Sequence, residues 1–364
     1  MTAASLPPSA PAALQLLVAD FTAGKNAALA RAVSIVENRR PGCDLLLAAM
    51  HPLIGRARRI GFTGPPGAGK STLTTQVALS LRRAGLRVGI VAVDPTSTFT
   101  GGALLGDRVR MESIALDPGV FIRSMATRGA LGGIAGAARE VCDVLDAFGM
   151  DRILVETVGV GQSELAVARA VDSTVVVLVP ESGDSIQTLK AGVMEIADLF
   201  VVNKADRPGA DRLRGDLESM LRLREGFTGD AASSHHGVTL TGAAVRPAQL
   251  ERVAVPVGEG TWMPPVLRSI GTAGEGIAEL VGAVDLHFAY LERAGILEQR
   301  RRARLRERVV NVVEERVSGR LWADAATMAW LEERLLDLES GRTNPYAVAD
   351  ALLARSTSLL AGLN

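Results

Sequence analysis

The stretch that decides the fold is IGFTGPPGAGKSTL, residues 60–73. A short apolar run, IGFT, leads directly into a loop of glycines and prolines, and the loop ends in a lysine and a serine. After the loop, Leu73, Val77 and Leu81 recur four residues apart, which predicts one apolar face of a helix. A glycine, Gly85, follows and is predicted to end that helix. The stretch therefore predicts a strand, a tight loop and an amphipathic helix in direct succession.

The loop fits the pattern G-x-x-x-x-G-K-[ST], which binds nucleotide phosphates. Its glycines allow backbone N–H groups to turn inward around phosphate oxygens, and the helix that follows adds its N-terminal dipole. Lys70 is predicted to reach the β and γ phosphates, and the Ser71 hydroxyl is predicted to ligate Mg²⁺. The residues expected to contact nucleotide here are Gly64, Pro65, Pro66, Gly67, Ala68, Gly69, Lys70, Ser71 and Thr72.

Short apolar runs alternate with longer helical patterns from residue 58 to residue 290. The runs are continuous and do not alternate in polarity, which is typical of parallel strands covered by helices on both faces. The predicted fold class is therefore α/β, with a doubly wound, mostly parallel sheet. In such sheets, ligands bind at the carboxyl ends of the strands. The predicted strands are IGFT (60–63), VGIVAV (88–93), VFIR (120–123), ILVE (153–156), TVVVLV (174–179), LFVVN (199–203) and VLRSI (266–270).

Acidic residues gather at these strand ends. Glu156 ends the strand ILVE, Asp94 follows VGIVAV, and Asp107 lies in the segment LLGDRVRM. Mg²⁺ on a triphosphate takes a few oxygen ligands and keeps several waters, so not every acid needs to touch the metal. The three carboxylates are predicted to surround the metal and the attacking water, and their division of labour stays open.

The loop behind Glu156 reads TVGVGQSE. Its glycines, Gly159 and Gly161, permit a backbone N–H near the γ-phosphate and let the loop move on hydrolysis, so a nucleotide-sensing switch is predicted here. Gln162 is a candidate for orienting the attacking water. Arg108 is a candidate for neutralising charge on the transferred phosphoryl group, and a simple ion pair is the alternative for it.

The strand 199–203 runs into the motif NKAD. The Asp206 carboxylate can accept hydrogen bonds from N1–H and the 2-amino group of guanine, which adenine does not offer, so GTP is favoured over ATP. The aliphatic part of the Lys204 side chain is expected to lie along the guanine base, and Asn203 is expected to tie this loop to the phosphate loop. After the last strand, GTAGEG is expected to offer backbone N–H groups to the base at Thr272 and Ala273.

The composition is that of an ordinary globular protein. Apolar residues make up 48% and charged residues 22% of the 364, and Lys plus Arg balance Asp plus Glu at 40 each, so no basic field favours nucleic acid. The N-terminus lacks the pattern of a secretory signal, and no run reaches the roughly 18 apolar residues that span a bilayer. Cys43 and Cys142 are expected to be buried thiols in a reducing compartment. We expect a cytoplasmic protein without membrane contact.

The chain is expected to have three parts. These are an N-terminal helical extension (1–57), a nucleotide-binding domain (58–290) and a C-terminal helical dimerisation arm (291–364) that packs on another chain. Within the middle part, residues 224–260 break the periodicity with Gly, Ser and small polar residues, which predicts a surface insertion.

Two polar features have ordinary explanations. His235 and His236 adjoin in the insertion without a nearby Cys, so an exposed polar pair is favoured over a metal site. The run RRRARLRER at 300–308 is expected on the solvated or inter-subunit face of a helix, with Leu305, Val309 and Val313 on its other side. Contact with an acidic partner is the alternative for this run.

Four longer blocks carry a specific resemblance: VDPTSTFTGGALLGDRVRM, VFIRSMATRGALGGI, ILVETVGVGQSE and GDSIQTLKAGVMEIADLFVVNKAD. Together they resemble the MeaB/ArgK/MMAA family of P-loop GTPases, over residues 12–224 and 261–310. The resemblance implies a homodimeric chaperone of an adenosylcobalamin-dependent acyl-CoA mutase. It also implies that the protein uses GTP and Mg²⁺ to gate cofactor loading and to protect or reactivate the mutase.

By position, the resemblance assigns the same phosphate, metal and guanine residues as the motifs do. It further implies that the block GDSIQTLKAG is an additional switch that communicates with the mutase, through Asp184, Gln187 and Lys190. Two departures stand out. Thr98 stands where such sequences often have proline, which is expected to loosen the first switch, and the insertion 224–260 is longer than the usual connection.

The leading hypothesis is thus a slow GTPase, stimulated by its partner, whose hydrolysis times a protein–protein event. An ATP- or GTP-dependent small-molecule kinase of the transport-linked ArgK type is the first alternative, and Asp206 argues against ATP. A metal-insertion GTPase would need a Cys/His cluster, whereas the chain has 2 cysteines and 4 histidines. A non-hydrolysing scaffold is disfavoured by the complete phosphate loop. The identity of the mutase stays open.

Overall fold

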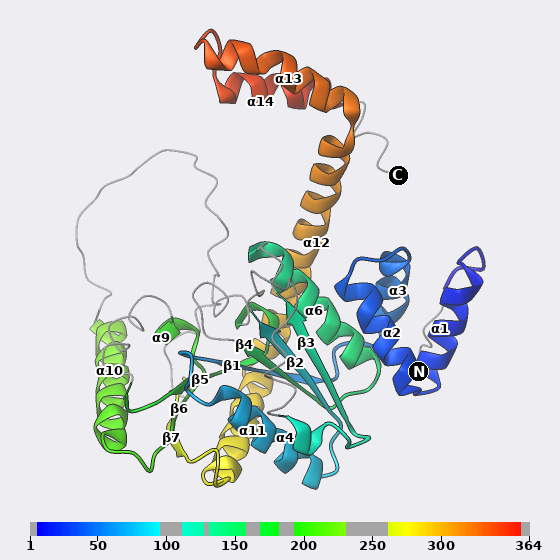
Figure 1. Cartoon of the computed structure of the whole chain (residues 1–364). Helices are drawn as coiled ribbons and strands as arrows, with labels where there is room; N and C mark the ends of the chain where they lie inside the picture. Colours follow the sequence, from blue (N-terminus) through cyan, green and yellow to red (C-terminus); the bar gives the residue numbers. More distant parts are fainter. Residues whose placement is uncertain are drawn as a thin grey trace. The chain divides into compact units, whose positions relative to one another are not determined.

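A computed structural model describes residues 6–94, 111–126, 131–157, 168–181, 193–230 and 261–357. Its centre is a seven-stranded parallel sheet in the order β3-β2-β4-β1-β5-β6-β7, flanked by helices (Figure 1). The strands are β1 (Arg58–Thr63), β2 (Val88–Asp94), β3 (Val120–Ala126), β4 (Arg152–Thr157), β5 (Ser173–Leu178), β6 (Leu199–Asn203) and β7 (Val266–Ser269).

All of the predicted strands are confirmed, and so is the doubly wound α/β class. The apolar runs are continuous because helices cover both faces of the sheet. In β5, Val175 and Val177 face one core, while Val176 and Leu178 face another. The strand ends shift by up to three residues, since backbone pairing does not depend on side-chain polarity; β3, for example, pairs with β2 as far as Ala126.

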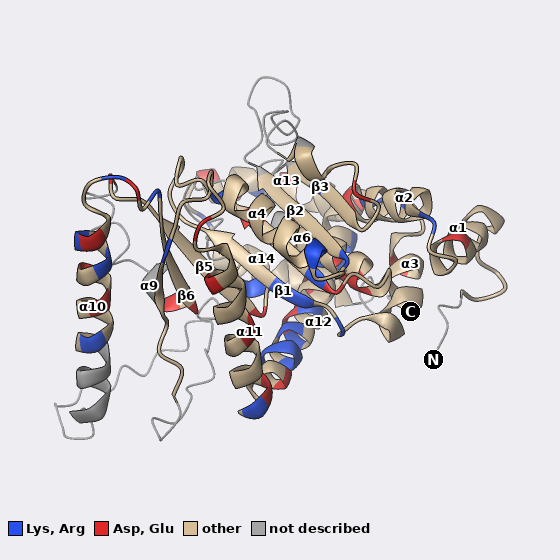
Figure 2. Ribbon diagram, turned by 90° about the horizontal axis from the view of Figure 1, so that it is seen from below, with Lys and Arg blue, Asp and Glu red and all other residues tan. Residues whose placement is uncertain are grey.

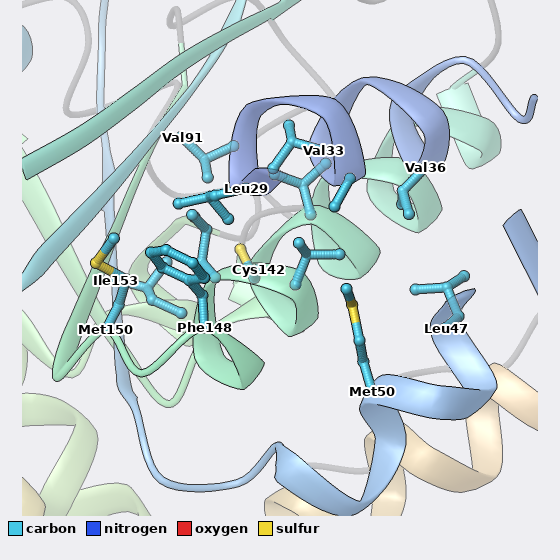
Figure 3. Packing of buried hydrophobic residues seen from close by; sticks show 14 of the residues in the cluster. Leu29, Val33, Val36, Leu47, Met50, Val91, Cys142, Phe148, Met150 and Ile153 are labelled. Atoms are coloured by element: carbon cyan, nitrogen blue, oxygen red, sulfur yellow. The ribbon is translucent and has the colours of Figure 1, made fainter. Parts of the chain in front are cut away.

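Three helices lie where the N-terminal helical extension is predicted: α1 (Ala12–Thr22), α2 (Asn26–Glu37) and α3 (Cys43–Met50). With α6 (Leu131–Ala147) they bury one face of β2, β3 and β4. Figure 3 shows Leu29 and Val33 of α2 close to Val91 of the sheet and Cys142 of α6. The extension therefore shares a hydrophobic core with the sheet.

Both cysteines lie in this core. Cys43 and Cys142 are buried free thiols, as predicted. Burial, followed by the negative charge of Glu140, raises the pKa of the Cys43 thiol above its ordinary value. A raised pKa keeps the thiol protonated and poorly reactive at neutral pH.

Two helices cover the opposite face of the sheet, α4 (Lys70–Arg83) and α11 (Ile277–Arg293). Leu73, Val77 and Leu81 of α4 are buried there, which confirms the predicted apolar face. A third cluster forms where α10 (Ala210–Asp230) packs on β5 and β6 through Leu213 and Leu217. The short helices are η1 (His51–Leu53), η2 (Glu112–Ile114) and α9 (Val193–Ile196).

A buried ionic cluster closes the amino-terminal edge of the sheet. Arg59 of β1 donates to Asp143 (2.8 Å) and Asp146 (3.2 Å), both on α6. Asp146 also accepts from the backbone N–H groups of Gly55, Arg56 and Ala57, at 2.8, 3.1 and 2.9 Å. Burial alone would lower the pKa of Arg59, but the surrounding carboxylates outweigh it and raise the pKa above its ordinary value. Arg59 therefore stays charged, and Asp146 fixes the chain that enters β1.

Replacing Asp146 by alanine is expected to destabilise the protein by about 3–5 kcal/mol, the usual cost of breaking a buried ion pair. The substitution removes the common acceptor of three backbone N–H groups and one partner of the buried Arg59. Urea unfolding followed by circular dichroism measures the loss. Asp151→Ala is the matched control, because Asp151 accepts from Arg87 N at an exposed position and should cost less than about 1 kcal/mol. Equal losses in the two variants would contradict the role given to the cluster.

A second polar cluster joins the starts of β5 and β6 to α11 and to Arg300, which lies seven residues after the end of α11. Arg300 donates to Asp198 (3.1 Å) and to the carbonyl of Asp172 (2.7 Å). His287 of α11 lies 2.9 Å from the Ser173 hydroxyl through Nδ1 and 3.5 Å from Asp198 through Nε2. These contacts fix α11 and the first turn of the next helix against the edge opposite the strand ends.

The chain divides into two compact units, Met1–Arg300 and Arg301–Asn364. The helices of the C-terminal region are α12 (Ile296–Ala323), α13 (Ala325–Glu339) and α14 (Pro345–Arg355). In the second unit, Asp324 caps α13 by accepting from Thr327 N (2.8 Å), and Asn344 caps α14 by accepting from Ala347 N (3.0 Å). Large exposed apolar side chains of this unit are Leu305, Val309, Val310, Val313, Trp322, Met328, Leu335, Leu336, Tyr346 and Leu353.

Charged side chains of both signs alternate along α10 (Figure 2). Arg214 and Glu218 pair there at 2.8 Å, one helical turn apart. The helix continues to Asp230, so the first part of the predicted insertion 224–260 is helical, and His235 and His236 lie outside the described residues. Among the helices of the described ranges, none has the length and apolar character that crossing a membrane requires.

Candidate nucleotide-binding and hydrolysis site

The phosphate loop connects β1 to α4 in a form that requires glycine. Gly64, Gly67 and Gly69 have φ of 137°, 74° and 86°, in the region that side-chain-bearing residues rarely adopt. A Cβ on Gly64 would lie 2.1 Å from the carbonyl oxygen of Val177, and one on Gly69 would lie 2.4 Å from Nδ2 of Asn203. The motif glycines are thus fixed by backbone conformation and by close approach of neighbouring strands.

Lys70 and Ser71 open α4 and are both buried. The Lys70 ammonium donates to the carbonyl oxygens of Gly64 and Pro65, each at 2.9 Å, so it lies inside the curl of the loop. No described side chain caps this helix, so its first-turn N–H groups and its dipole suit a phosphate anion. The Lys70 ammonium therefore lies at the start of α4, together with the first-turn backbone N–H groups and the positive end of the helix dipole, as the motif predicts.

The Glu156 side chain reaches from β4 to the start of α4, where Lys70 and Ser71 lie. The Ser71 hydroxyl donates to Glu156 Oε1 at 2.5 Å, and Glu156 is 2% exposed. A buried carboxylate beside the hydroxyl that is predicted to ligate Mg²⁺ fits the oxygen preference of that ion. This contact joins two motifs that are far apart in the sequence.

The other predicted residues around the metal are only partly described. Asp94 ends β2, and its backbone is level with Ala126 of β3, while its side chain is not described. The order β2-β4-β1 brings Asp94 to the same edge of the sheet as Glu156 and the phosphate loop. The predicted residues outside the described ranges are Thr98, Asp107, Arg108, Gly159, Gly161, Gln162, Asp184, Gln187 and Lys190.

The predicted guanine loop follows β6 at the same edge. Asn203 is buried, and its amide Nδ2 donates to the carbonyl of Ala68 at 2.8 Å, so the predicted tie to the phosphate loop is present. Its Oδ1 accepts from Ser269 Oγ (3.1 Å) and from Gly271 N (3.0 Å). Lys204 has a positive φ of 55°, which turns the chain sharply between Asn203 and the partly exposed loop that carries Asp206.

The second base loop is short and closed on itself. Ile270 and Glu275 form an isolated antiparallel bridge, and Ala273 N donates to Ile270 O at 2.9 Å. Thr272 and Ala273 are exposed at the tip of this loop. Gly276 ends the loop with φ 76°, and a Cβ there would lie 2.1 Å from the carbonyl oxygen of Arg268. The loop therefore has a defined shape before any base binds.

A family model described as "Methylmalonyl Co-A mutase-associated GTPase MeaB" matches residues 29–326. The chain belongs to the MeaB family. A relative in Pyrococcus horikoshii, whose name gives it as a candidate GTPase, is 40% identical over 339 residues, which cover 93% of this chain and 97% of the relative. GTPase ArgK of Escherichia coli is 35% identical, with 88% of this chain and 90% of the relative covered.

More distant relatives agree with this membership. The mouse mitochondrial protein named methylmalonic aciduria type A homolog is 31% identical, with 91% of this MeaB-family chain and 76% of the relative covered. A solved structure titled LAO/AO transport system kinase superposes with a TM-score of 0.63 at 28% identity, covering 96% and 99% of the two chains. The MeaB-family chain is a GTPase, and it binds guanine nucleotide.

The motifs predict no role for two residues that hold Asn203. Ser269 ends β7 and Gly271 opens the second base loop, and both hold the Asn203 side chain. Gly271 is the first residue of the predicted GTAGEG loop, whereas the sequence signal for Ser269 is its place near the end of the last predicted strand. Asn203 thus joins the phosphate loop to both base loops.

Asn203→Ala is expected to weaken GDP binding by about tenfold to thirtyfold. Each neutral hydrogen bond contributes about 0.5–1.5 kcal/mol net, and part of that loss is regained because the loops still order on the nucleotide. Titration with a fluorescent guanine nucleotide measures the change. Ser269→Ala removes one of the bonds and should weaken binding by about threefold. If Asn203→Ala bound GDP as tightly as the unmodified protein, the coupling of the three loops would have no part in binding.

Proposed function

We propose that this MeaB-family GTPase is a chaperone of an adenosylcobalamin-dependent acyl-CoA mutase, such as methylmalonyl-CoA mutase. In this role GTP binding and hydrolysis gate the loading of the cofactor and protect or reactivate the mutase. The observation that carries the proposal is the family match over residues 29–326, because the description of that family names a mutase-associated GTPase. The mouse relative, named for methylmalonic aciduria, supports the same assignment.

The geometry of the site supports a GTPase whose hydrolysis times a protein–protein event. The Ser71 hydroxyl at the start of α4 donates a hydrogen bond to Glu156, and the loop predicted to sense the nucleotide begins directly after Glu156. A change at the phosphates can therefore pass through Ser71 and its hydrogen bond with Glu156 into that segment. Asp94, Asp107, Arg108 and Gln162 stay predictions for the hydrolytic step, and Asp184, Gln187 and Lys190 stay predictions for contact with the mutase.

Mg²⁺ fits the donor groups that the structure brings together. Ser71 offers a hydroxyl oxygen and Glu156 offers a buried carboxylate beside it, and both are ligand types that Mg²⁺ prefers. These residues, with the Asp94 carboxylate as a further candidate, would hold the ion. When bound, Mg²⁺ neutralises charge on the phosphate oxygens. Lys70 would supply the matching positive charge from the protein.

We also propose that the protein is a homodimer whose C-terminal helices, 291–364, form the dimerisation arm. The many large apolar side chains exposed on the second unit support this, because exposed apolar residues on a helical unit favour an interaction surface. Leu336 and Tyr346, for example, are 69% and 83% exposed. Sedimentation velocity of the full chain tests it, and a monomer at micromolar concentration would count against the arm.

The decisive experiment compares hydrolysis of GTP and ATP by the full chain, alone and with each cobalamin-dependent mutase of its host. A slow, GTP-specific rate that rises with one mutase is expected, and it would name the client. A GTP-specific rate that no mutase changes would keep the GTPase and refute the chaperone role.

A small-molecule kinase is the second candidate, favoured by one observation. The solved structure that superposes over nearly the whole chain is titled as a transport system kinase. ATP turnover equal to GTP turnover, together with phosphate transfer to a small-molecule acceptor, would favour this alternative and would mean that Asp206 does not select guanine.

A further inference from the structure

Two threonines face each other at the root of the phosphate loop. Thr63 is the last residue of β1, and Thr157 is the last residue of β4. The two strands are parallel neighbours with Phe62 level with Glu156, so Thr63 and Thr157 occupy the next level of the ladder. Both residues are 0% exposed, and the Thr157 hydroxyl donates to the Thr63 hydroxyl at 3.2 Å.

The neighbouring residue on β4 makes the other contact with the phosphate loop. Successive side chains of a strand point to opposite sides, so Glu156 and Thr157 reach different targets. Glu156 holds Ser71, which follows the loop, and Thr157 holds Thr63, which precedes it. Two consecutive residues of β4 are therefore hydrogen-bonded to the residues on either side of the phosphate loop.

The two hydrogen bonds differ in strength. The bond from Ser71 to Glu156 involves a carboxylate and measures 2.5 Å, whereas the bond between the two hydroxyls is neutral and long at 3.2 Å. A long bond between fully buried groups contributes little to overall stability, but it restricts where the end of β4 lies relative to the loop. That end carries the Glu156 carboxylate, and the chain passes from Thr157 directly into residues 158–167.

We propose that Thr157, acting through Thr63, is a positioning residue for GTP hydrolysis. The hydroxyl pair holds the end of β4 level with the phosphate loop, and this alignment sets the position of Glu156 against Ser71 in the step that cleaves GTP. The inference rests on the GTPase activity of the family and not on the chaperone role, so it stands or falls independently of any mutase.

The test uses Thr157→Val, Thr63→Val and the double variant in the full chain. Each single variant is expected to lower kcat about three- to tenfold, with KM within about twofold, because the hydroxyl aligns a catalytic group and does not touch the nucleotide. The double variant should lose no more than either single variant, because the pair acts as one unit. Thr157→Ser and Thr63→Ser keep the hydroxyl and are expected to restore most of the rate.

Thr174→Val is the matched control, since Thr174 is a buried threonine at the opposite end of a neighbouring strand, and its kcat should stay unchanged. Melting temperatures of all variants separate alignment from stability. Three results would overturn the proposal: valine variants that melt earlier but keep kcat, serine variants as slow as the valine variants, or additive losses in the double variant.

Discussion

Replacing Lys70 by alanine is expected to lower the rate of GTP hydrolysis by about 10²–10³-fold, the usual cost of removing one preorganised donor from a transition state. The Lys70 ammonium lies inside the phosphate loop, 2.9 Å from the carbonyl oxygens of Gly64 and Pro65, and the side chain is buried. It is therefore already in place when nucleotide arrives. Single-turnover hydrolysis with saturating GTP measures the chemical step, and fluorescent nucleotide titration measures binding.

Two companion variants make the result specific. Lys70→Arg keeps the positive charge, but the planar guanidinium cannot take the place of a compact ammonium between two carbonyl oxygens. Its rate of hydrolysis should therefore be little higher than that of Lys70→Ala. Lys25→Ala removes a lysine that pairs with Asp20 on the surface, and it should hydrolyse GTP at the normal rate. Normal hydrolysis by Lys70→Ala would refute the assignment of the phosphate loop.

The parts of the fold that follow from local pattern were predictable. Each of the seven strands contains a short apolar run, as expected for parallel strands in a sheet flanked by helices, and the α4 helix shows its buried stripe at Leu73, Val77 and Leu81. The phosphate loop was predictable for a different reason. Its backbone conformation requires glycine at set positions, as the approach of Gly64 to Val177 O shows, so the sequence motif alone predicts the shape of the loop.

Apart from the predicted tie of Asn203 to the phosphate loop, the contacts between distant segments were not predictable, because they depend on which strands become neighbours. The sequence pattern gives no reason for Asn203 to be held by Ser269, a residue on another strand, or for Asp146 to hold the backbone before β1. The same holds for the bond between Ser71 and Glu156, since the predicted set of acids left the roles of its members open. These contacts follow only once the order β2-β4-β1-β5-β6-β7 is fixed.

Glu156→Gln is expected to lower GTP hydrolysis by about a hundredfold and to raise the Mg²⁺ concentration that hydrolysis requires. The Ser71 hydroxyl donates a hydrogen bond to the Glu156 carboxylate at 2.5 Å, which leaves lone pairs of the hydroxyl oxygen to ligate a metal. An amide keeps the size of the side chain but loses its charge, and changing a residue that orients a metal ligand typically costs about 10–100-fold. Hydrolysis measured across a Mg²⁺ titration reports both effects.

The loss in Glu156→Gln should separate from folding and from nucleotide binding. Without Mg²⁺, the variant is expected to bind GDP within about threefold of the unmodified protein, because Lys70 and the loop backbone still hold the phosphates. Glu156→Asp keeps the charge on a shorter side chain, so a partial loss there would show that reach matters as well as charge. Glu218→Gln changes a partly exposed glutamate that pairs with Arg214 on α10; it is the control and should leave hydrolysis unchanged. If Glu156→Gln hydrolysed GTP normally with an unchanged Mg²⁺ requirement, its contact with Ser71 would be structural, and the metal would have to be held by the remaining predicted acids.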